Sequence, residues 1–517
     1  MFVHIQDDER TVRFIGFNLF IFFVATYLLT ASGAAFSDVA QMRVEVARSI
    51  IERMDLNVPS GTGMIGADGR EYSWFGIGSV VLFIPIFLFG KLAGLPPENV
   101  VSVMNHFFGA ATAVLVFLVS ISLGYSRRAS VLVSMIYGLG TMAWYYSKDS
   151  GDHTIETFFI LFSIYSMHRY TAHQKTSHLL LSALSFGFSL ITRPTAILIM
   201  PTLFIMLFFR NIKKVNYKIS LNRPAKDIFL FFIVLIPFIV LIFWYNHYRF
   251  GSLFESGYAL MAARLGVDYF SGTSLLAGIR GFLASPGKGF FYYSPITVLF
   301  FFSIRSFSKK YPVTALCFIL LMLSYLLLYS KYLFWHGASG WGPRFLFMIT
   351  PYLIIPIAEL FDSADWRAKK SLRVFVYTVF AVSLIVQLAS VSVSPNKYRH
   401  YLQLDEKVKF SVAAGDGVQP IVGPPLETYF DWNLSPILTQ FKFIREMTLN
   451  LKEYTHVQPS KVTLTVETIR SAPEMNVFDF WWLYRYVIEG SYSGFFAALL
   501  LLFISLFSAT RAWRAVR

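Results

Sequence analysis

The chain has 517 residues, of which 55% are hydrophobic and only 15% are charged, and its formal net charge is +15. This composition is too apolar for a soluble domain, and repeated runs of about twenty apolar residues predict transmembrane helices. The basic residues gather in short connections such as 210–214, 306–310 and 367–370. Basic connections of this kind are typical of the cytoplasmic side of a membrane protein, so we expect no nucleic-acid partner.

The first apolar run, residues 12–32, lacks a small-residue cleavage site and predicts an uncleaved membrane span. The run 76–95 differs from the others because it contains four glycines and Pro85, and two prolines follow it. If this run stays on the outer face, every basic connection lies inside. We therefore predict an outer juxtamembrane helix at 76–95 and twelve crossings in an all-α polytopic membrane protein, at about 12–32, 100–123, 128–146, 153–170, 178–192, 195–209, 227–248, 289–304, 312–330, 345–361, 371–393 and 491–510.

This topology divides the chain into a transmembrane module over 1–393, an outer segment over 394–490, and a final span with a basic tail over 491–517. The first outer connection covers 33–99. The outer segment holds ten Lys/Arg and eleven Asp/Glu, so it is nearly neutral, unlike the inner connections. Alternating residues predict a strand at 461–467. A helix is predicted by an apolar stripe that consists of Ile437, Phe441, Ile444 and Leu451. We therefore expect a small mixed α/β cap. The single cysteine, Cys317, excludes an intrachain disulfide.

Asp38 lies at the outer mouth of the first span and opens an amphipathic stretch that runs to about Asp55. A carboxylate so close to hydrocarbon is costly to desolvate and commonly marks a functional site. Ser37 is a natural N-cap, and the dipole of the helix that follows favours an ionised Asp38. An ionised carboxylate there can accept a proton from an attacking hydroxyl, so we predict a catalytic base. The alternative is that Asp38 merely improves the helix start.

The second outer connection carries Asp149, Asp152, His153 and Glu156. Asp152 and Glu156 are four residues apart and would share one helical face, with His153 beside them. We predict Glu156 as a second catalytic carboxylate, and Asp152 and His153 as substrate contacts. A divalent metal on Asp152, His153 and Glu156 is an alternative that these residue types leave open. The sequence contains no tight ligand motif that would establish a metal or any other cofactor.

Two arginines at the outer boundary could bind a phosphate through paired hydrogen bonds. Arg193 interrupts two apolar runs, and Arg344 ends a stretch rich in Gly, Trp and His that contains His336 and Trp341. The alternative for each arginine is an anchor at lipid headgroups. One face of the protein would thus combine cations, boundary carboxylates and aromatic residues. This combination suits a phosphate ester whose tail lies in the bilayer, such as a sugar linked to a polyprenyl phosphate. The polyprenyl phosphate leaves as a stable anion and needs no proton. One carboxylate base and cations that bind the phosphate could therefore drive displacement at the anomeric carbon with inversion.

In order and sidedness, these motifs resemble the GT-C superfamily of polyprenyl-phosphate-sugar glycosyltransferases, in the branch of protein O-mannosyltransferases and lipid A aminoarabinose transferases. The resemblance covers roughly residues 10–360 and rests on Phe36-Ser37-Asp38, Asp68 to Ser73, Glu156, Thr192-Arg193-Pro194, Tyr245-Asn246, Gly257-Tyr258 and Trp341 to Arg344. It implies the GT-C fold, with Asp38 as base, Glu156 as the acidic residue of the second outer connection, and a juxtamembrane helix at 76–95. We add Arg70 to Arg193 and Arg344 as predicted contacts to the donor phosphate, and predict substrate contacts at Tyr72, Asp152, His153, Tyr258, His336 and Trp341.

The expected function is transfer of a sugar from a polyprenyl-phosphate donor to a lipid, glycan or protein acceptor. The resemblance implies a bacterial cytoplasmic (inner) membrane with the active site on the extracytoplasmic side. One alternative is a lipid or glycan flippase or transporter, which would be expected to show repeated halves or charges deep in the membrane. Another is a protein like an O-antigen ligase or polymerase, which would share the substrate class.

Overall fold

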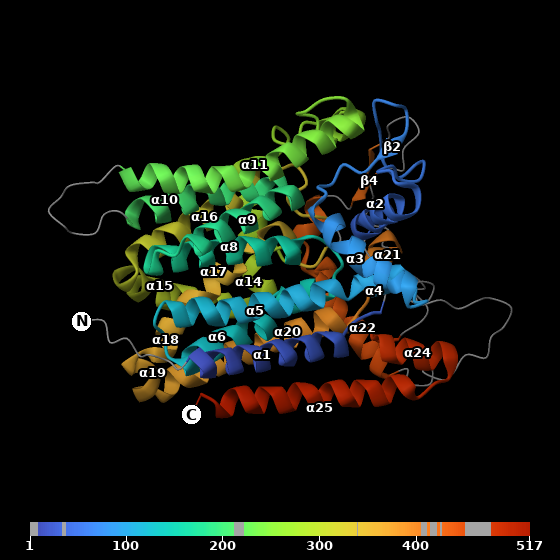
Figure 1. The fold of residues 1–517 in the computed structure, drawn as a ribbon. Helices are drawn as coiled ribbons and strands as arrows, with labels where there is room; N and C mark the ends of the chain where they lie inside the picture. The colour runs from blue at the N-terminus through green and yellow to red at the C-terminus, as the bar shows by residue number, and fades with distance from the viewer. Residues whose placement is uncertain are drawn as a thin grey trace.

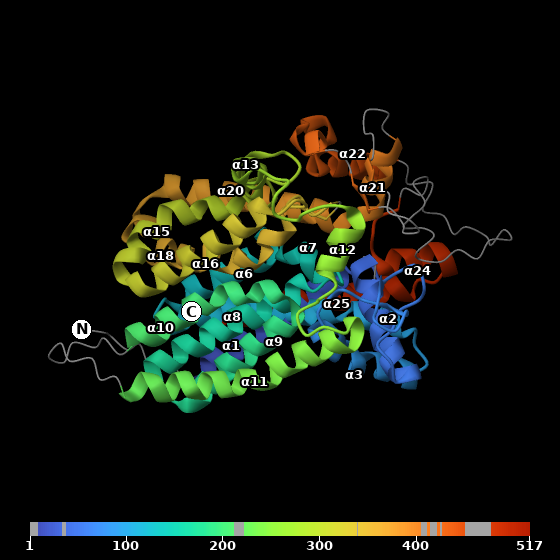
Figure 2. The same cartoon turned by 90° about the horizontal axis from the view of Figure 1, so that it is seen from above.

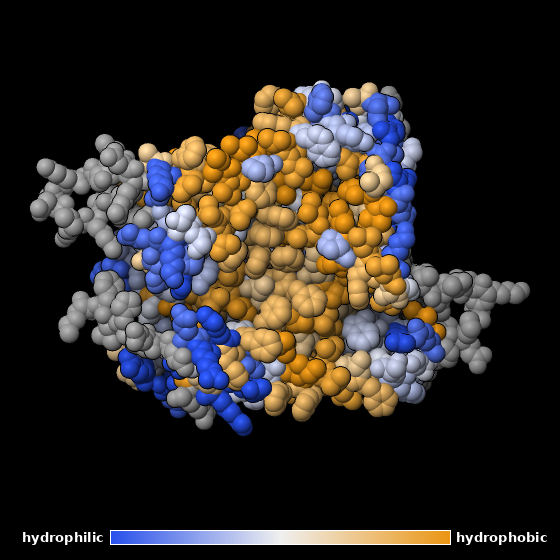
Figure 3. Space-filling model, viewed as in Figure 1, coloured by the Kyte–Doolittle hydropathy of each residue, from blue (hydrophilic) through white to orange (hydrophobic). Residues whose placement is uncertain are grey.

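The structure is a computed structural model that describes residues 9–33, 38–210, 222–338, 340–404, 411–413, 421–423, 426–449 and 477–516. Its long helices run side by side in a bundle (Figures 1 and 2). Apolar side chains form a broad belt across the middle of the bundle, with polar side chains at both ends (Figure 3). The predicted all-α polytopic class is confirmed.

In the described part of the chain, seven helical stretches are long and apolar enough to cross a bilayer. They are α1 (Glu9–Leu29), α4 with α5 (Pro97–Ser102, Met104–Ser122), most of α11 (Asn222–Phe250), α16 (Pro312–Lys331), η3 to α18 (Arg344–Ile349, Thr350–Ile354, Ile355–Ile357, Ala358–Asp362), α20 (Lys370–Ser392) and α25 (Ser493–Arg514).

The other predicted crossings correspond to helices that are less apolar, shorter or broken. They are α6 with α7 (Arg127–Gly140, Ala143–Lys148), α8 (His153–His173), α9 (Thr176–Thr192), η1 with α10 (Pro194–Ile199, Met200–Arg210), and α14, η2 and α15 (Phe290–Tyr293, Pro295–Val298, Leu299–Lys310). Several of the breaks fall at prolines, which remove a backbone donor. The count of twelve crossings therefore stays a prediction.

Helix α3 (Gly78–Leu92) lies at one end of the bundle together with α2 (Asp38–Arg53) and α4 (Figures 1 and 2). A Cβ at Gly78 would come within 2.2 Å of the Thr192 Oγ1 atom, so this glycine lets α3 begin directly against the end of α9. At the other end of α3, Gly90 packs on Pro97, the first residue of α4. This position agrees with the predicted juxtamembrane helix. We call this end of the bundle the outer end.

Short elements cover the outer end. The strands β1 (Met64–Ile65) and β2 (Glu71–Tyr72) form an antiparallel pair, as do β3 (Ser411–Ala413) and β4 (Ile421–Gly423). The remaining helices are α12 (Tyr258–Leu265), α13 (Leu275–Ala284), α21 (Pro395–Leu404), η5 (Leu426–Phe430), η6 (Trp432–Leu434), α22 (Pro436–Leu449) and α24 (Trp481–Glu489), while α19 (Ala364–Ala368) lies at the opposite end.

The predicted cap is described only in part, and the expected strand at 461–467 lies outside the described residues. The expected helix is present as α22, and Leu451 of the predicted stripe lies outside the described residues. Ile437 is partly buried and packs against the main core, whereas Phe441 is 37% exposed and Thr439, Gln440 and Met447 are buried. The described part of the stripe thus coincides only partly with the buried face, because periodicity shows that a helix has an apolar face, not which face the neighbouring elements cover.

The end of the bundle opposite the outer end carries the basic connections, and we call it the basic end. Helix α25 packs along α1, so segments from the two extremes of the described chain lie side by side (Figure 1). The hydroxyls of Thr26 and Ser505 form a hydrogen bond of 2.8 Å between these two helices. In hydrocarbon, close packing and hydrogen bonds of this kind hold helices together, because lipid tails are as apolar as the side chains they meet.

Candidate functional site

A cavity of about 750 Å³ opens at the outer end. Its walls come from α2, the segment before α3, the start of α8, the turn between α9 and η1, α12, and the connection that joins α16 to η3. Six residues that the sequence predicts for the site line it: Asp152, His153, Arg193, Tyr258, His336 and Arg344. Residues that are far apart in the sequence therefore meet in one chamber.

Two arginines and two carboxylates form a buried cluster beside this cavity. The Arg43 Nη2 atom lies 2.7 Å from the Asp152 Oδ2 atom, and Arg193 Nη1 lies 3.3 Å from Asp152 Oδ1. The Nε atom of Arg193 lies 3.4 Å from Glu156 Oε2. Burial raises the pKa of the Asp152 carboxyl, but the Arg43 and Arg193 guanidiniums outweigh it and hold that pKa well below its usual value. The two positive and two negative formal charges of the cluster sum to zero.

The backbone around Arg193 explains why its side chain reaches the cluster. Helix α9 ends at Thr192, Arg193 is extended, and Pro194 begins η1, so the side chain turns back toward α8. Glu156 is fully buried and lies outside the cavity lining. Its Oε1 atom also accepts hydrogen bonds from the Tyr325 hydroxyl, at 3.4 Å, and the Thr195 hydroxyl, at 3.5 Å. The structure thus places Glu156 behind Arg193, away from the space that a substrate could enter.

Of the three arginines that line the cavity, Arg344 is the one that pairs with no described carboxylate. Its Nε atom is buried without a hydrogen-bond partner among the described residues. Two glycines make room for this side chain. A Cβ at Gly337, where φ is +63°, would approach the Arg344 Nε atom to 2.7 Å, and a Cβ at Gly340 would lie 3.0 Å from its Cδ atom. The ammonium of Lys288 donates to the Ala338 and Gly340 carbonyls and so braces the loop.

His336 presents a neutral imidazole to the cavity. Burial, together with the nearby charges of Lys288 and Arg344, lowers the pKa of His336 to about 3. Its Nδ1 atom accepts a hydrogen bond of 3.0 Å from the Ala338 backbone, so the proton must sit on Nε2. The ring is stacked on Tyr429, with 4.5 Å between the ring centroids. His336 can therefore donate one hydrogen bond from Nε2 in a fixed direction.

Aromatic side chains form most of the remaining wall. The rings of Tyr329 and Phe345 are stacked at 4.7 Å, and the cavity is also lined by Trp74, Phe75, Tyr258, Tyr269, Phe270, Tyr332 and Phe334. Trp74 and Phe75 follow Ser73, whose carbonyl accepts a hydrogen bond from the buried Arg249 guanidinium. Arg249 also donates to the Tyr245 carbonyl and stacks on the Tyr245 ring, so it ties this wall to α11. Aromatic faces of this kind suit the apolar faces of a sugar ring or the first units of a lipid tail.

The side chain of Asp38 lies outside the described residues. Helix α2 begins at Asp38, as the sequence predicts. Five residues further along α2, Arg43 reaches the cavity, where it pairs with Asp152 and lies over the Phe75 ring at 4.3 Å. The sequence analysis did not identify Arg43. The only signal in the sequence was a basic residue five positions after Asp38 in the same predicted amphipathic stretch. Its carboxylate partner, Asp152, is 109 residues away in the chain, so spacing could not reveal the pair.

Three other predicted residues lie outside the cavity lining. Arg70 pairs with Asp55 and Asp68, and the Tyr72 hydroxyl donates to the Asp68 carboxylate at 2.8 Å. These contacts tie the β1–β2 connection to Asp55, which follows α2. Trp341 is buried against the Tyr293 ring, with 4.8 Å between centroids. The resemblance assigned these residues by motif, and their contacts in the structure are with neighbouring protein groups.

The described residues contain no group of three or more His, Cys, Asp or Glu side chains arranged to hold a metal ion. Asp152 and Glu156 are engaged by arginines, and the His153 ring nitrogens face Arg193 Nη1 at 3.1 and 3.3 Å. A guanidinium occupies the place that a cation would need. The metal alternative is therefore not supported by the arrangement of Asp152, His153 and Glu156.

Comparison with solved structures identifies the fold. The chain is similar to ArnT from Cupriavidus metallidurans bound to undecaprenyl phosphate, with a TM-score of 0.50 and 12% identity, over 99% of this chain and 78% of that one. It is also similar to the oligosaccharyltransferase of Archaeoglobus fulgidus in its apo form, with a TM-score of 0.52 and 12% identity, over 80% of this chain and 59% of that one. The same archaeal enzyme, AglB, in complex with an inhibitory peptide and a dolichol-phosphate gives a TM-score of 0.50 at 12% identity, over 75% of this chain and 59% of that one.

No protein-family model matches the chain. No curated protein matches it by sequence either. At 12% identity these solved structures establish the fold alone, which is the GT-C fold.

Proposed function

We propose that this integral membrane protein is a glycosyltransferase that moves a sugar from a polyprenyl-phosphate donor to a lipid, glycan or protein acceptor. The observation that carries the proposal is Arg344, a cavity-lining cation whose charge is not matched by a described carboxylate. The GT-C fold is consistent with it. Among proteins that share this fold, ArnT was solved with undecaprenyl phosphate and AglB with a dolichol-phosphate.

Arg344 is the proposed contact for the donor phosphate, because a guanidinium can give a phosphate two parallel hydrogen bonds. Its Nε atom has no partner among the described residues, and Gly337 and Gly340 leave space for the side chain. The Nε2–H group of His336 would supply a further donor to the phosphate or the sugar. The aromatic wall, including Tyr258, would hold the sugar ring and the start of the lipid tail.

Asp38 is the proposed general base. In the transfer step, the acceptor oxygen forms a bond to the anomeric carbon from the side opposite the phosphate. The bond between that carbon and the phosphate oxygen breaks, and its electron pair leaves with the polyprenyl phosphate. The acceptor proton passes to the Asp38 carboxylate, so the configuration inverts and no cofactor is consumed. Arg344 would stabilise the negative charge that develops on the departing phosphate.

The buried cluster has a different proposed role from the one the sequence suggested. Glu156 and Asp152 would orient Arg193 and Arg43, and so fix the walls that α2, α8 and η1 contribute. Glu156 is therefore proposed as a positioning residue, not as a group that touches substrate. Arg70, Tyr72 and Trp341 contact neighbouring protein groups outside the cavity lining, so our proposal gives them no contact with the substrate.

The outer end, with the cavity, is proposed to face the extracytoplasmic side of a bacterial cytoplasmic (inner) membrane. The basic connections at the other end would then lie in the cytoplasm. This orientation follows the positive-inside rule.

The test uses the purified protein in lipid nanodiscs with radiolabelled polyprenyl-phosphate hexoses and pentoses and a membrane extract as acceptor source. Asp38→Asn should lower transfer by about 100-fold or more while donor binding persists. Arg344→Gln should weaken donor binding about tenfold to hundredfold. Arg70→Gln serves as the matched control, because this outer-end arginine lies outside the cavity, and it should leave donor binding unchanged.

Equal donor binding by Arg344→Gln and the unaltered protein would refute the phosphate contact. If no donor supports transfer, but the protein moves a labelled lipid between leaflets, the flippase alternative replaces the proposal.

A further inference from the structure

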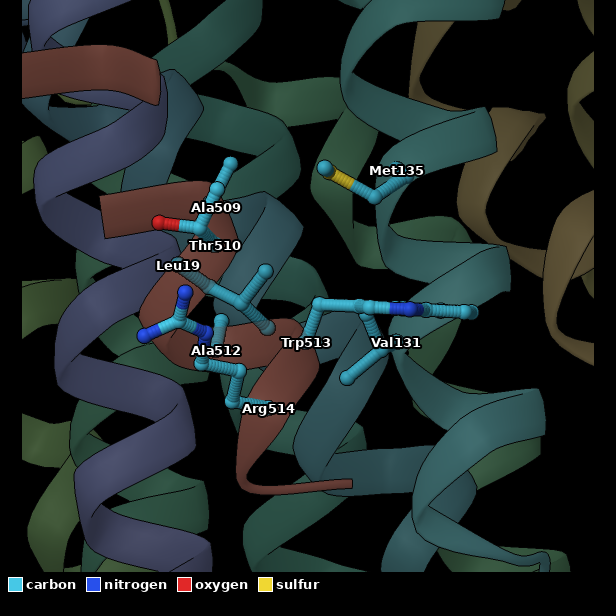
Figure 4. A pocket seen from close by; sticks show the side chains of 8 residues that line it. All are labelled: Leu19, Val131, Met135, Ala509, Thr510, Ala512, Trp513 and Arg514. Atoms are coloured by element: carbon cyan, nitrogen blue, oxygen red, sulfur yellow. The ribbon is translucent and has the colours of Figure 1, made fainter. Parts of the chain in front are cut away.

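A second hollow lies at the basic end, far from the cavity just described. It has a volume of about 380 Å³ and is open on one side. It lies between α1, α6 and α25, and its lining residues are Leu19, Val131, Met135, Ala509, Thr510, Ala512, Trp513 and Arg514. Figure 4 shows Trp513 of α25 reaching toward Val131 and Met135 of α6. We call this hollow the basic-end groove.

The floor of the basic-end groove is apolar, and its rim is cationic. Leucine, valine, methionine and alanine side chains supply the floor, and Arg514 belongs to the lining itself. The Arg128 guanidinium lies over the ring of Trp513, a lining residue, at 5.8 Å. The groove therefore combines a surface for an acyl chain with positive charge beside it.

These rim arginines are available for an anion. Arg128 and Arg514 form no ion pair with a described carboxylate, whereas the carboxylate of Glu9 at the start of α1 is already paired with Arg13 at 3.0 Å. The cation–π contact with Trp513 leaves the edge of the Arg128 guanidinium open for hydrogen bonds. Arginine binds phosphate through two parallel hydrogen bonds.

We propose that the basic-end groove binds an anionic glycerophospholipid from the leaflet at that end of the bundle. Its phosphate would contact Arg514 and Arg128, and an acyl chain would lie along Leu19, Val131 and Met135. Charge complementarity favours this occupant, because basic pockets between transmembrane helices on the cytoplasmic side suit the headgroups of anionic lipids. The proposal is independent of the glycosyltransferase proposal, since the groove shares no lining residue with the outer cavity.

The structural consequence of binding concerns the seam between α1 and α25. Arg514 and Trp513 lie in the last turns of α25, and Leu19 lies in the middle of α1. A lipid that touches all three would hold the end of α25 against the bundle. The bound lipid should therefore raise the thermal stability of the intact protein.

The test measures lipid binding by native mass spectrometry and the thermal midpoint of the full chain in mixed micelles. The probes are phosphatidylglycerol and phosphatidylcholine of the same acyl composition. The unaltered protein should bind phosphatidylglycerol about tenfold more tightly than phosphatidylcholine, with a higher thermal midpoint, and the preference should weaken in high salt. The double variant Arg128→Gln/Arg514→Gln should lose this preference.

Two further variants separate the outcomes. Arg367→Gln removes a charge from the same end at a residue that does not line the groove, and it should keep the lipid preference. Met135→Trp fills the groove without changing charge, and it should lower the affinity for both lipids. Retention of the full phosphatidylglycerol preference by Arg128→Gln/Arg514→Gln would overturn the proposal. So would a protein dimer that Met135→Trp abolishes, because the groove would then hold a second copy of the chain.

Discussion

The buried ion pair between Lys148 and Asp479 provides a sharp test of how the outer end is held together. Their side chains are 3% and 0% exposed, and the Lys148 Nζ atom lies 2.9 Å from Asp479 Oδ2. Lys148 also donates to the Val391 carbonyl at 2.7 Å, while the Tyr484 hydroxyl donates to Asp479 Oδ1 at 2.8 Å. The pair therefore joins α7, the end of α20 and the segment before α24.

Lys148→Met should be strongly destabilising, because it leaves the Asp479 carboxylate buried beside carbonyls that have lost a charged donor. Breaking a buried pair from one side costs about 3–5 kcal/mol. Asp479→Asn should cost a similar amount, since it leaves the ammonium uncompensated. The double variant Lys148→Met/Asp479→Asn removes both charges, so its loss should be smaller than the sum of the two single losses by about 2–3 kcal/mol.

The assay is reversible unfolding of the purified protein with increasing sodium dodecyl sulfate in mixed micelles, followed by tryptophan fluorescence. The exposed pair Arg485–Glu489, 2.8 Å apart and about half exposed, gives the matched control. Its removal should change the unfolding free energy by less than about 1 kcal/mol. If the losses of Lys148→Met and Asp479→Asn simply add in the double variant, the two side chains do not interact and the reasoning fails.

Three further results are expected. Gly337→Ala should weaken donor binding about tenfold, because its Cβ would lie 2.7 Å from the Arg344 Nε atom and displace the guanidinium from the phosphate. The left-handed alanine costs about 1–2 kcal/mol of folding free energy, so the protein should stay folded. Unchanged affinity by isothermal titration would contradict this. Burial raises the pKa of Asp149 to about 6 although Arg344 lowers it, so below pH 6 Asp149 becomes neutral and ceases to oppose an incoming phosphate. The affinity of the unaltered protein for polyprenyl phosphate, divided by the affinity of Asp149→Asn, should therefore rise as the pH falls from 7 to 5. A ratio that stays constant over this range would exclude a link to Asp149. Cys317, which is fully buried, should resist a maleimide in the native protein and react after unfolding, and rapid native labelling would show that its helix packing is wrong.

The fold class could be predicted because the signals that define it are local. Long apolar runs reveal membrane helices without knowledge of which helices touch. The loop around Arg344 could be recognised for a related reason. Gly337 and Gly340 are local features, and the structure shows that both leave space for the arginine side chain.

Roles that depend on distant partners could not be predicted in the same way. Glu156 looked catalytic because an acid stood at a membrane boundary, but its burial depends on Arg193 and on Tyr325 from α16. Arg43 escaped notice because only the folded chain brings Asp152 beside it. The sequence shows where a charged residue would be costly to desolvate. Only the tertiary structure shows whether that residue pairs with another protein group or faces the cavity.

The contact between α1 and α25 also determines when the packing of α1 can be completed during synthesis. The hydroxyls that join these helices belong to residues 479 positions apart. At the usual pace of translation, roughly 25 to 95 s separate the emergence of the two helices. During that interval the face of α1 that α25 will cover must rest against lipid or an insertion factor. Helix α1 can pack against α5 early, but its contact with α25 is among the last of the bundle to form.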